Sequence, residues 1–177
     1  MAGTATGNDC DVDTSNNAGC GVQASTDYSF GPSFNAIGGG WYAMERNPDS
    51  ISVWFWARNA TGTVPSDMSS GNDSIDTDAW GTPTAYFPNT QCDIDSHFSA
   101  NNIIFDLTFC GDWAGIDSVF NAAGCPGDCV GEFFSTIHHT MQICGLSQHL
   151  SPSDFVNNNA SSFADAYWDV AAVRVYT

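Results

Sequence analysis

The sequence has no lysine and few charged residues of any kind. Its three basic residues are all arginines, and with 20 acidic residues they give a net charge of −17 at pH 7. Only 13% of the residues are charged, against roughly 25% in an average domain. Such an acidic surface repels nucleic acid and anionic membranes. We therefore expect a neutral partner, such as a neutral glycan, and neither a nucleic acid nor a membrane.

The sequence also lacks a long apolar run, so no segment is predicted to span a membrane. Residues 1–8 lack the basic and apolar regions of a secretory signal peptide. Seven cysteines and three Asn-x-Ser/Thr glycosylation sites nevertheless indicate an oxidising, extracellular compartment. The two observations agree if Met1 is not the natural start of the protein, which is what we expect.

The cysteine spacing does not favour a zinc site. Cys125 and Cys129 form a C-x3-C pair that has no matching second pair. The acidic run at Asp11 and Asp13 lacks the glycine and the terminal glutamate of a calcium-binding loop. No metal and no cofactor is therefore expected.

Four stretches have the composition of β-strands. They are rich in β-branched and aromatic residues, and clusters of Gly, Pro, Asn, Asp and Ser separate them. The predicted strands are 38–45, 51–57, 103–109 and 167–176. Because side chains alternate across a strand, Val53 and Phe55 are expected on one face, and Trp54 and Trp56 on the other. A chain of 177 residues suits one domain, and these patterns predict an all-β sandwich or jelly roll, expected to be a monomer.

Several motifs, in order, carry a closer resemblance. Together they resemble segments of fungal laminarinases, the endo-β-1,3(4)-glucanases of glycoside hydrolase family 16. The similarity covers residues 1–177 as one domain, apart from 131–153. The motifs are residues 40–45, 53–56, 80–83, 96–115 and 166–168.

The resemblance implies a concanavalin-like jelly-roll sandwich with a β-glucan cleft on its concave face. Family members retain configuration at the sugar and use a Glu-x-Asp-x-x-Glu strand, in which one glutamate attacks while the other donates a proton. This sequence has only two glutamates, Glu45 and Glu132, and neither lies in such a motif. No catalytic residue is therefore assigned. We expect that the N-terminal part of the domain, with its catalytic strand, is missing, and that the isolated chain aggregates or stays partly molten.

Four residues are predicted to bind glucan. Trp113 and Asp112 match a segment that lines sugar subsites in the family, and a Trp face stacks well on a glucose ring. His97 is expected in the cleft by resemblance, and Asp106 because it interrupts an apolar strand. The alternatives are a core tryptophan, a structural histidine and a sheet-edge aspartate. Glu45 is expected to form a structural ion pair with Arg46 or Arg58.

Two other classes of function remain open. A non-catalytic β-glucan-binding jelly roll needs aromatic side chains but no pair of carboxylates. A disulfide-stabilised extracellular interaction protein needs neither. A Glu-x-Asp-x-x-Glu strand upstream of Met1 would identify an enzyme and exclude the first class. The absence of any β-glucan binding would favour the second class.

Residues 131–153 do not resemble the family. They hold three of the four histidines and Cys144, which makes the cysteine count odd. Possible codons for Gly131–Glu132 and Ser153–Asp154 contain splice donor and acceptor dinucleotides, and removal of these 23 codons restores the family's pattern after Val130. We therefore predict a retained intron, poorly packed, with Cys144 unpaired. A His-rich metal-binding loop is the alternative.

Overall fold

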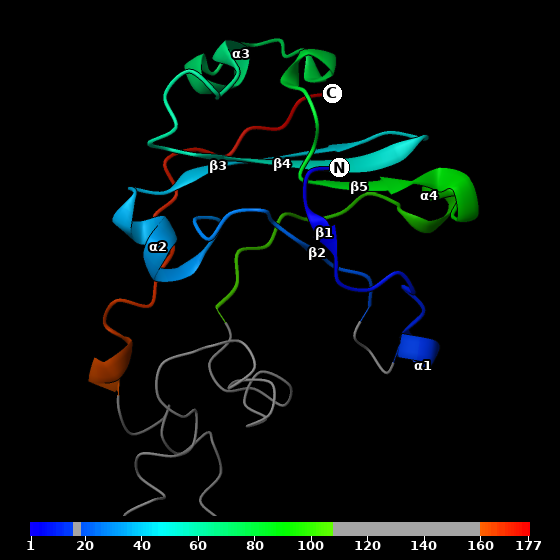
Figure 1. Ribbon diagram of the computed structural model, residues 1–177, viewed down its shortest axis with the longest axis horizontal. Coiled ribbons are helices and arrows are strands. Elements are labelled where there is room, and N and C mark those ends of the chain that lie inside the picture. The colour runs from blue at the N-terminus through cyan, green and yellow to red at the C-terminus, as the bar shows by residue number, and fades with distance from the viewer. Residues whose placement is uncertain (16–18, 108–159) are drawn as a thin grey trace, which may run out of the picture. The chain divides into compact units, whose positions relative to one another are not determined.

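A computed structural model describes residues 1–15, 19–107 and 160–177 (Figure 1). The chain divides into two compact units, and each is considered by itself. Unit 1 is Met1–Asn101 with Arg174–Thr177, and unit 2 is Asn102–Val173. Within the described residues, no helix is long and apolar enough to cross a membrane.

Unit 1 contains two antiparallel sheets and several short helices, which confirms the all-β prediction. The first sheet pairs β1 with β2, and the second has the order β3-β4-β5. The strands are β1 (Thr4–Ala5), β2 (Val22–Gln23), β3 (Gly40–Arg46), β4 (Ser50–Ala57) and β5 (Ala85–Pro88). The helices of unit 1 are α1 (Val12–Ser15), α2 (Gly31–Ala36), α3 (Ser66–Ser70), η1 (Thr77–Trp80), η2 (Asn89–Gln91) and α4 (Ile94–His97).

A tight turn joins β3 and β4 and sets their register. The side-chain oxygen of Asn47 accepts hydrogen bonds from the backbone N–H groups of Asp49 (3.0 Å) and Ser50 (2.9 Å), a use of Asn that is typical of turns. Trp41 then lies opposite Trp56, and Tyr42 opposite Phe55. The predicted strands at 38–45 and 51–57 are therefore confirmed, with small changes at their ends.

The β3-β4-β5 sheet has an aromatic cluster on each face, as the alternation of side chains predicts. On one face, Trp80 stands edge-on to both Trp54 and Trp56. On the other, Phe55 contacts Tyr42 and the Phe34 ring from α2. The expectation that at least one of the two β4 tryptophans belongs to the core is confirmed, because Trp54 is only 5% exposed. Among the described residues the buried apolar side chains are few: Trp54, Ala85 and Ile94.

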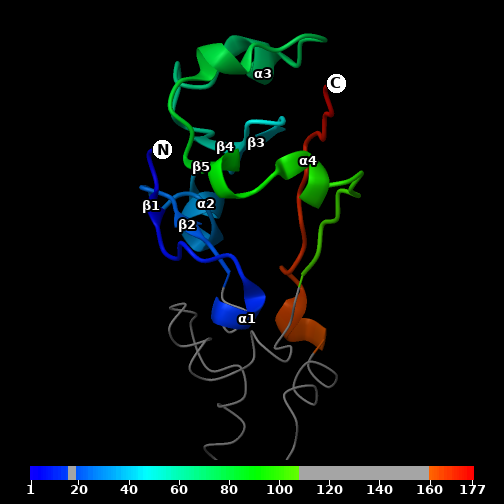
Figure 2. The ribbon, with the colours of Figure 1, turned by 90° about the vertical axis from the view of Figure 1, so that its right-hand side faces the viewer.

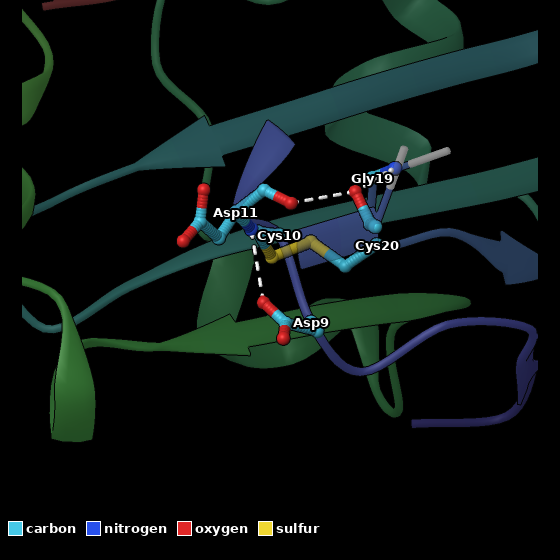
Figure 3. Close-up of a disulfide and its surroundings, with 6 residues drawn as sticks. Asp9, Cys10, Asp11, Gly19 and Cys20 are labelled. Atoms are coloured by element: carbon cyan, nitrogen blue, oxygen red, sulfur yellow. Dashed lines mark hydrogen bonds between the residues drawn. A yellow bond between two sulfur atoms is a disulfide. The ribbon is translucent and has the colours of Figure 1, made fainter. Parts of the chain in front are cut away.

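The residues just before β1 form backbone hydrogen bonds with the residues just before β5. The N–H of Gly3 donates to the carbonyl of Thr84 at 2.9 Å, and the N–H of Ala2 donates to that of Pro83 at 2.8 Å. A Cβ atom at position 3 would lie 2.7 Å from the Thr84 oxygen, so this close approach requires glycine. A disulfide between Cys10 and Cys20 closes the loop between β1 and β2 (Figure 3).

The structure corrects the two remaining strand predictions. The predicted strand at 103–109 is described as far as Leu107, and neither it nor 167–176 is assigned to a sheet. Figure 2 shows both segments as coil rather than arrows. A strand is defined by hydrogen bonds to a neighbour, and neither segment has a strand neighbour among the described residues. The described helix outside unit 1 is η3 (Ala160–Phe163). Residues 131–153, including Cys144, lie outside the described residues.

Candidate functional site

The structure describes two of the four residues predicted to bind glucan. His97 lies in unit 1 and Asp106 in unit 2, so each is considered within its own unit. Asp112 and Trp113 lie outside the described residues. Their assignment as binding residues stays a prediction.

His97 is the last residue of α4 and is exposed. Its Nδ1 lies 2.8 Å from the carbonyl oxygen of Asp93 and 2.9 Å from the hydroxyl of Ser96. Both partners belong to the turn that carries the histidine, and the buried Ile94 anchors that turn. The imidazole is therefore oriented by its own helix, as the structural alternative requires, while its Nε2 has no partner among the described residues.

Asp106 lies beside two aromatic rings in unit 2. Its carboxylate accepts a hydrogen bond from the N–H of Leu107 at 2.8 Å, and its backbone carbonyl accepts one from the indole N–H of Trp168 at 2.9 Å. The Phe105 and Trp168 rings are 6.2 Å apart at 64°, and both side chains are exposed. An exposed carboxylate beside exposed aromatic faces suits a sugar, because the ring stacks while the hydroxyls bond to oxygen.

Trp168 was not predicted as a binding residue. In the sequence Trp168 stands out only as part of the 166–168 motif, because nothing in a linear pattern shows that two segments more than fifty residues apart meet. The indole–carbonyl hydrogen bond to Asp106 is what connects them. Trp168 therefore joins Asp106 as a described candidate for contact with substrate.

In unit 1, Asp67 fixes the position of Trp80 on the sheet. Its carboxylate accepts hydrogen bonds from the Asp76 N–H at 2.9 Å and from the Trp80 indole N–H at 3.1 and 3.2 Å. The bond from the Asp76 N–H, more than that from Trp80, lowers the pKa of Asp67 below its ordinary value. The charged form therefore stabilises the segment that covers this aromatic face.

The expected ion pair at Glu45 is wrong. Its carboxylate accepts a hydrogen bond from the Thr77 hydroxyl at 2.7 Å. Arg46 instead donates to the Ser99 carbonyl and the Asn101 side chain, at 3.1 and 2.9 Å.

The geometry of β3 explains the difference. Consecutive side chains on a strand point to opposite faces, so Arg46 leaves the face on which Glu45 lies. Arg58 follows the far end of β4, where its guanidinium lies 5.4 Å from the centre of the Trp41 ring. Glu45 therefore serves to hold Thr77 over the sheet.

The acidic loop near the disulfide binds its own backbone. Asp9 accepts a hydrogen bond from the N–H of Asp11 (Figure 3), and Asp11 accepts one from the N–H of Asp13, both at 3.0 Å. The bond from Asp13 is the main reason that the pKa of Asp11 is lowered. In the part of the chain that the structure describes, no three metal-ligating side chains gather.

Known proteins match this chain along almost its whole length. The model of the XgeA-like catalytic GH16 domain matches residues 1–176. A probable glycosidase of Schizosaccharomyces pombe is 42% identical over 99% of this chain and 36% of its own length. A probable endo-1,3(4)-beta-glucanase of Aspergillus clavatus is 36% identical over 99% of this chain and 24% of its own.

A solved structure is closer still in sequence. Laminarinase 16A from Phanerochaete chrysosporium, solved with two beta-glucans in its donor and acceptor sites, is 60% identical, with a TM-score of 0.75. The match covers 95% of this chain and 48% of the laminarinase chain.

These matches define the class of the protein as an all-β jelly roll of the kind found in glycoside hydrolases. The chain belongs to glycoside hydrolase family 16. It spans about a third of the length of the S. pombe relative and about half of the solved laminarinase chain.

Proposed function

We propose that this chain forms part of an endo-β-1,3(4)-glucanase domain and contributes to the binding of β-glucan. The observation that carries the proposal is the 60% identity to laminarinase 16A, whose structure holds beta-glucans. The Asp106–Trp168 pair supports it from within the chain, because it presents a carboxylate and exposed aromatic rings together. Trp113, Asp112 and His97 are the further binding residues that we propose.

The reaction itself requires two carboxylates about 5 Å apart. The chain has two glutamates, and Glu45 is occupied by its hydrogen bond to Thr77. No Glu-x-Asp-x-x-Glu motif occurs in the 177 residues. We therefore place the attacking and proton-donating groups outside this chain, which supplies binding surface rather than the reacting carboxylates.

A non-catalytic β-glucan-binding module is the second candidate. The same absence of the Glu-x-Asp-x-x-Glu motif favours it. It differs from the first candidate in requiring that the 177 residues bind glucan alone, with no additional polypeptide.

We also propose an extracellular location for the protein. The Cys10–Cys20 disulfide supports an oxidising compartment. Asn59 and Asn72, two of the three glycosylation acceptors, are exposed, as N-linked glycosylation requires.

Co-sedimentation with insoluble β-1,3-glucan tests the proposed function. The chain is mixed with the polysaccharide, alone and with the unmatched portion of laminarinase 16A, and the bound fraction is measured. Binding only in the mixture, above that of the added portion alone, supports the part-domain proposal. Binding by the chain alone supports the module, and no binding in either sample contradicts both.

A further inference from the structure

The Cys10–Cys20 disulfide of unit 1 lies beside two carboxylates. Asp9 and Asp11 flank Cys10 in the sequence, and Figure 3 shows both next to the disulfide. Adjacent Cα atoms are about 3.8 Å apart, so both carboxylates lie within one Debye length of the Cys10 sulfur, about 10 Å at 0.1 M salt. Their charges therefore act on that sulfur wherever the other parts of the chain lie.

Hydrogen bonds within the loop hold these carboxylates in place. Asp9 accepts one from the N–H of Asp11, and Asp11 accepts one from the N–H of Asp13, both at 3.0 Å. The carbonyl of Asp11 accepts two from Ser15, from its N–H at 2.9 Å and its hydroxyl at 2.6 Å, and that hydroxyl accepts the Gly19 N–H at 3.1 Å. The bond from the Asp13 N–H is the main reason that the pKa of Asp11 is lowered, so Asp11 is charged at neutral pH.

The chain offers no lysine or arginine to neutralise the two charges. It has no lysine, and its three arginines are engaged at other places. Arg46 and Arg58 lie at opposite ends of β3, and Arg174 lies beside Gly71. Residues 16–18 and 108–159, which lie outside the described residues, contain neither lysine nor arginine. The negative charge beside Cys10 is therefore uncompensated by any permanent cation of the chain.

Reduction of a disulfide by a thiol brings a negative charge up to it. A thiolate attacks one sulfur, the S–S bond breaks, and the other cysteine leaves as a thiolate. A second thiolate then attacks the mixed disulfide and frees the first cysteine, so two thiols give up two electrons and end as one small disulfide. Because like charges repel, carboxylates beside Cys10 oppose this attack. The opposition is greatest for a thiol that carries a carboxylate of its own.

We propose that Asp9 and Asp11 form an electrostatic barrier that makes the Cys10–Cys20 disulfide selective for the charge of the reductant. Anionic thiols such as glutathione open it slowly, and thiols that carry an ammonium group open it faster. The disulfide closes the loop between β1 and β2, which have two residues each, and so short a hairpin is marginal without such a link. The barrier thus preserves the hairpin against anionic reductants. The inference concerns neither glucan binding nor hydrolysis, and it is independent of the proposed function.

Reduction by two thiols of different charge tests the proposal. The 177-residue chain is treated with mercaptoacetate or cysteamine and quenched by alkylation, and mass spectrometry measures free Cys10 and Cys20. Rates are expressed per thiolate and relative to those for a small neutral disulfide. We expect cysteamine to be favoured at least about tenfold at 0.01 M salt and less than about threefold at 1 M salt, where charges are screened. A ratio near one at 0.01 M salt, or no reduction by either thiol, would overturn the proposal.

Matched variants assign the barrier to the two carboxylates. Asp9→Asn combined with Asp11→Asn keeps an acceptor oxygen at each position while removing both charges, and should lower the cysteamine-to-mercaptoacetate ratio at least about threefold. Asp49→Asn combined with Asp78→Asn removes the same charge from exposed residues outside the β1–β2 hairpin, and should leave the ratio within about 1.5-fold. An unchanged ratio in the first pair, or an equal fall in both pairs, would contradict a barrier formed by Asp9 and Asp11.

Discussion

The indole of Trp80 stands edge-on to that of Trp54, with ring centroids 5.4 Å apart and ring planes at 87°. Edge-to-face pairs of this kind add about 0.5–1.5 kcal/mol beyond the area that they bury. The Trp54 N–H also donates to the carbonyl of Gly81 at 3.1 Å. The segment between β4 and β5 is thus attached to the sheet by rings and by a hydrogen bond.

Replacement of Trp54 should therefore be among the most destabilising changes in unit 1. In the chain refolded together with the unmatched portion of laminarinase 16A, we expect Trp54→Ala to lower the free energy of unfolding by about 3–5 kcal/mol, the usual range for a large aromatic core residue. Pulse proteolysis in urea, with cleavage followed within β3–β5, measures it. Tyr86→Ala on the same sheet face is the control, because Tyr86 is exposed. Equal losses from the two substitutions would show that Trp54 is not a core residue.

The hydrogen bonds to Asp67 predict a loss of stability in acid. The pKa of Asp67 is lowered from its ordinary value of 3.8, so its charged form stabilises the folded segment above that pH. The stabilisation falls as the pH drops below about 3.8 and is gone below the lowered folded value. Amide exchange of a peptide covering 66–80 should be constant from neutral pH to about pH 4, after correction for intrinsic rates, and faster in stronger acid.

Two variants check that this change belongs to Asp67. Asp67→Asn should remove the acid transition by making exchange fast at every pH. Asp27→Asn changes an exposed aspartate elsewhere in unit 1 and should leave the transition in place. If the acid transition persists in Asp67→Asn, another titrating group is its cause.

Local features of the fold were predictable from sequence, whereas contacts between distant segments were not. The strands β3 and β4 follow from dense aromatic and β-branched residues around the Asn47 turn, and alternation alone placed Trp54 and Trp56 on one face. The pairing of Glu45 with Thr77 was missed, because a nearby arginine is visible in sequence and a distant hydroxyl is not. Likewise, 103–107 and 167–176 have strand composition but no strand neighbour among the described residues, and composition alone does not show whether a neighbour is present.

The candidate site shows the same limit. His97 and Asp106 were identified by resemblance and by an acidic residue within an apolar run, and both are exposed. Trp168 was missed because its link to Asp106 runs between segments far apart in the sequence. The family could be recognised from the sequence, whereas the contact between Asp106 and Trp168 is visible only in the structure.

Trp113 is predicted to contribute directly to glucan affinity. In the complex with the unmatched laminarinase portion, Trp113→Ala should weaken laminarin binding by about 1–3 kcal/mol, because a sugar ring loses its aromatic face. Isothermal titration calorimetry measures the change. Tyr28→Ala, at another exposed aromatic residue, should have no effect. Unchanged affinity in a folded Trp113→Ala complex would favour a core position for Trp113.

Residues 131–153 are predicted to be a retained intron with an unpaired Cys144. Alkylation of the purified chain without reduction should label Cys144 and leave Cys10 and Cys20 unlabelled, since those two form a disulfide. Mass spectrometry of the digested chain reads out all three. Transcript sequencing should find most messages without these 23 codons. Recovery of Cys144 in a disulfide-linked peptide, or retention of the codons in most messages, would refute the prediction.

We propose that this family 16 chain does not itself hold the reacting carboxylates. Release of reducing sugar from laminarin by the purified 177-residue chain tests it most directly. We expect no release above the uncatalysed rate, because the attacking and proton-donating groups supply most of the lowering of the barrier. Hydrolysis by the chain alone that Glu45→Gln abolishes would contradict the account, and would make Glu45 a catalytic residue.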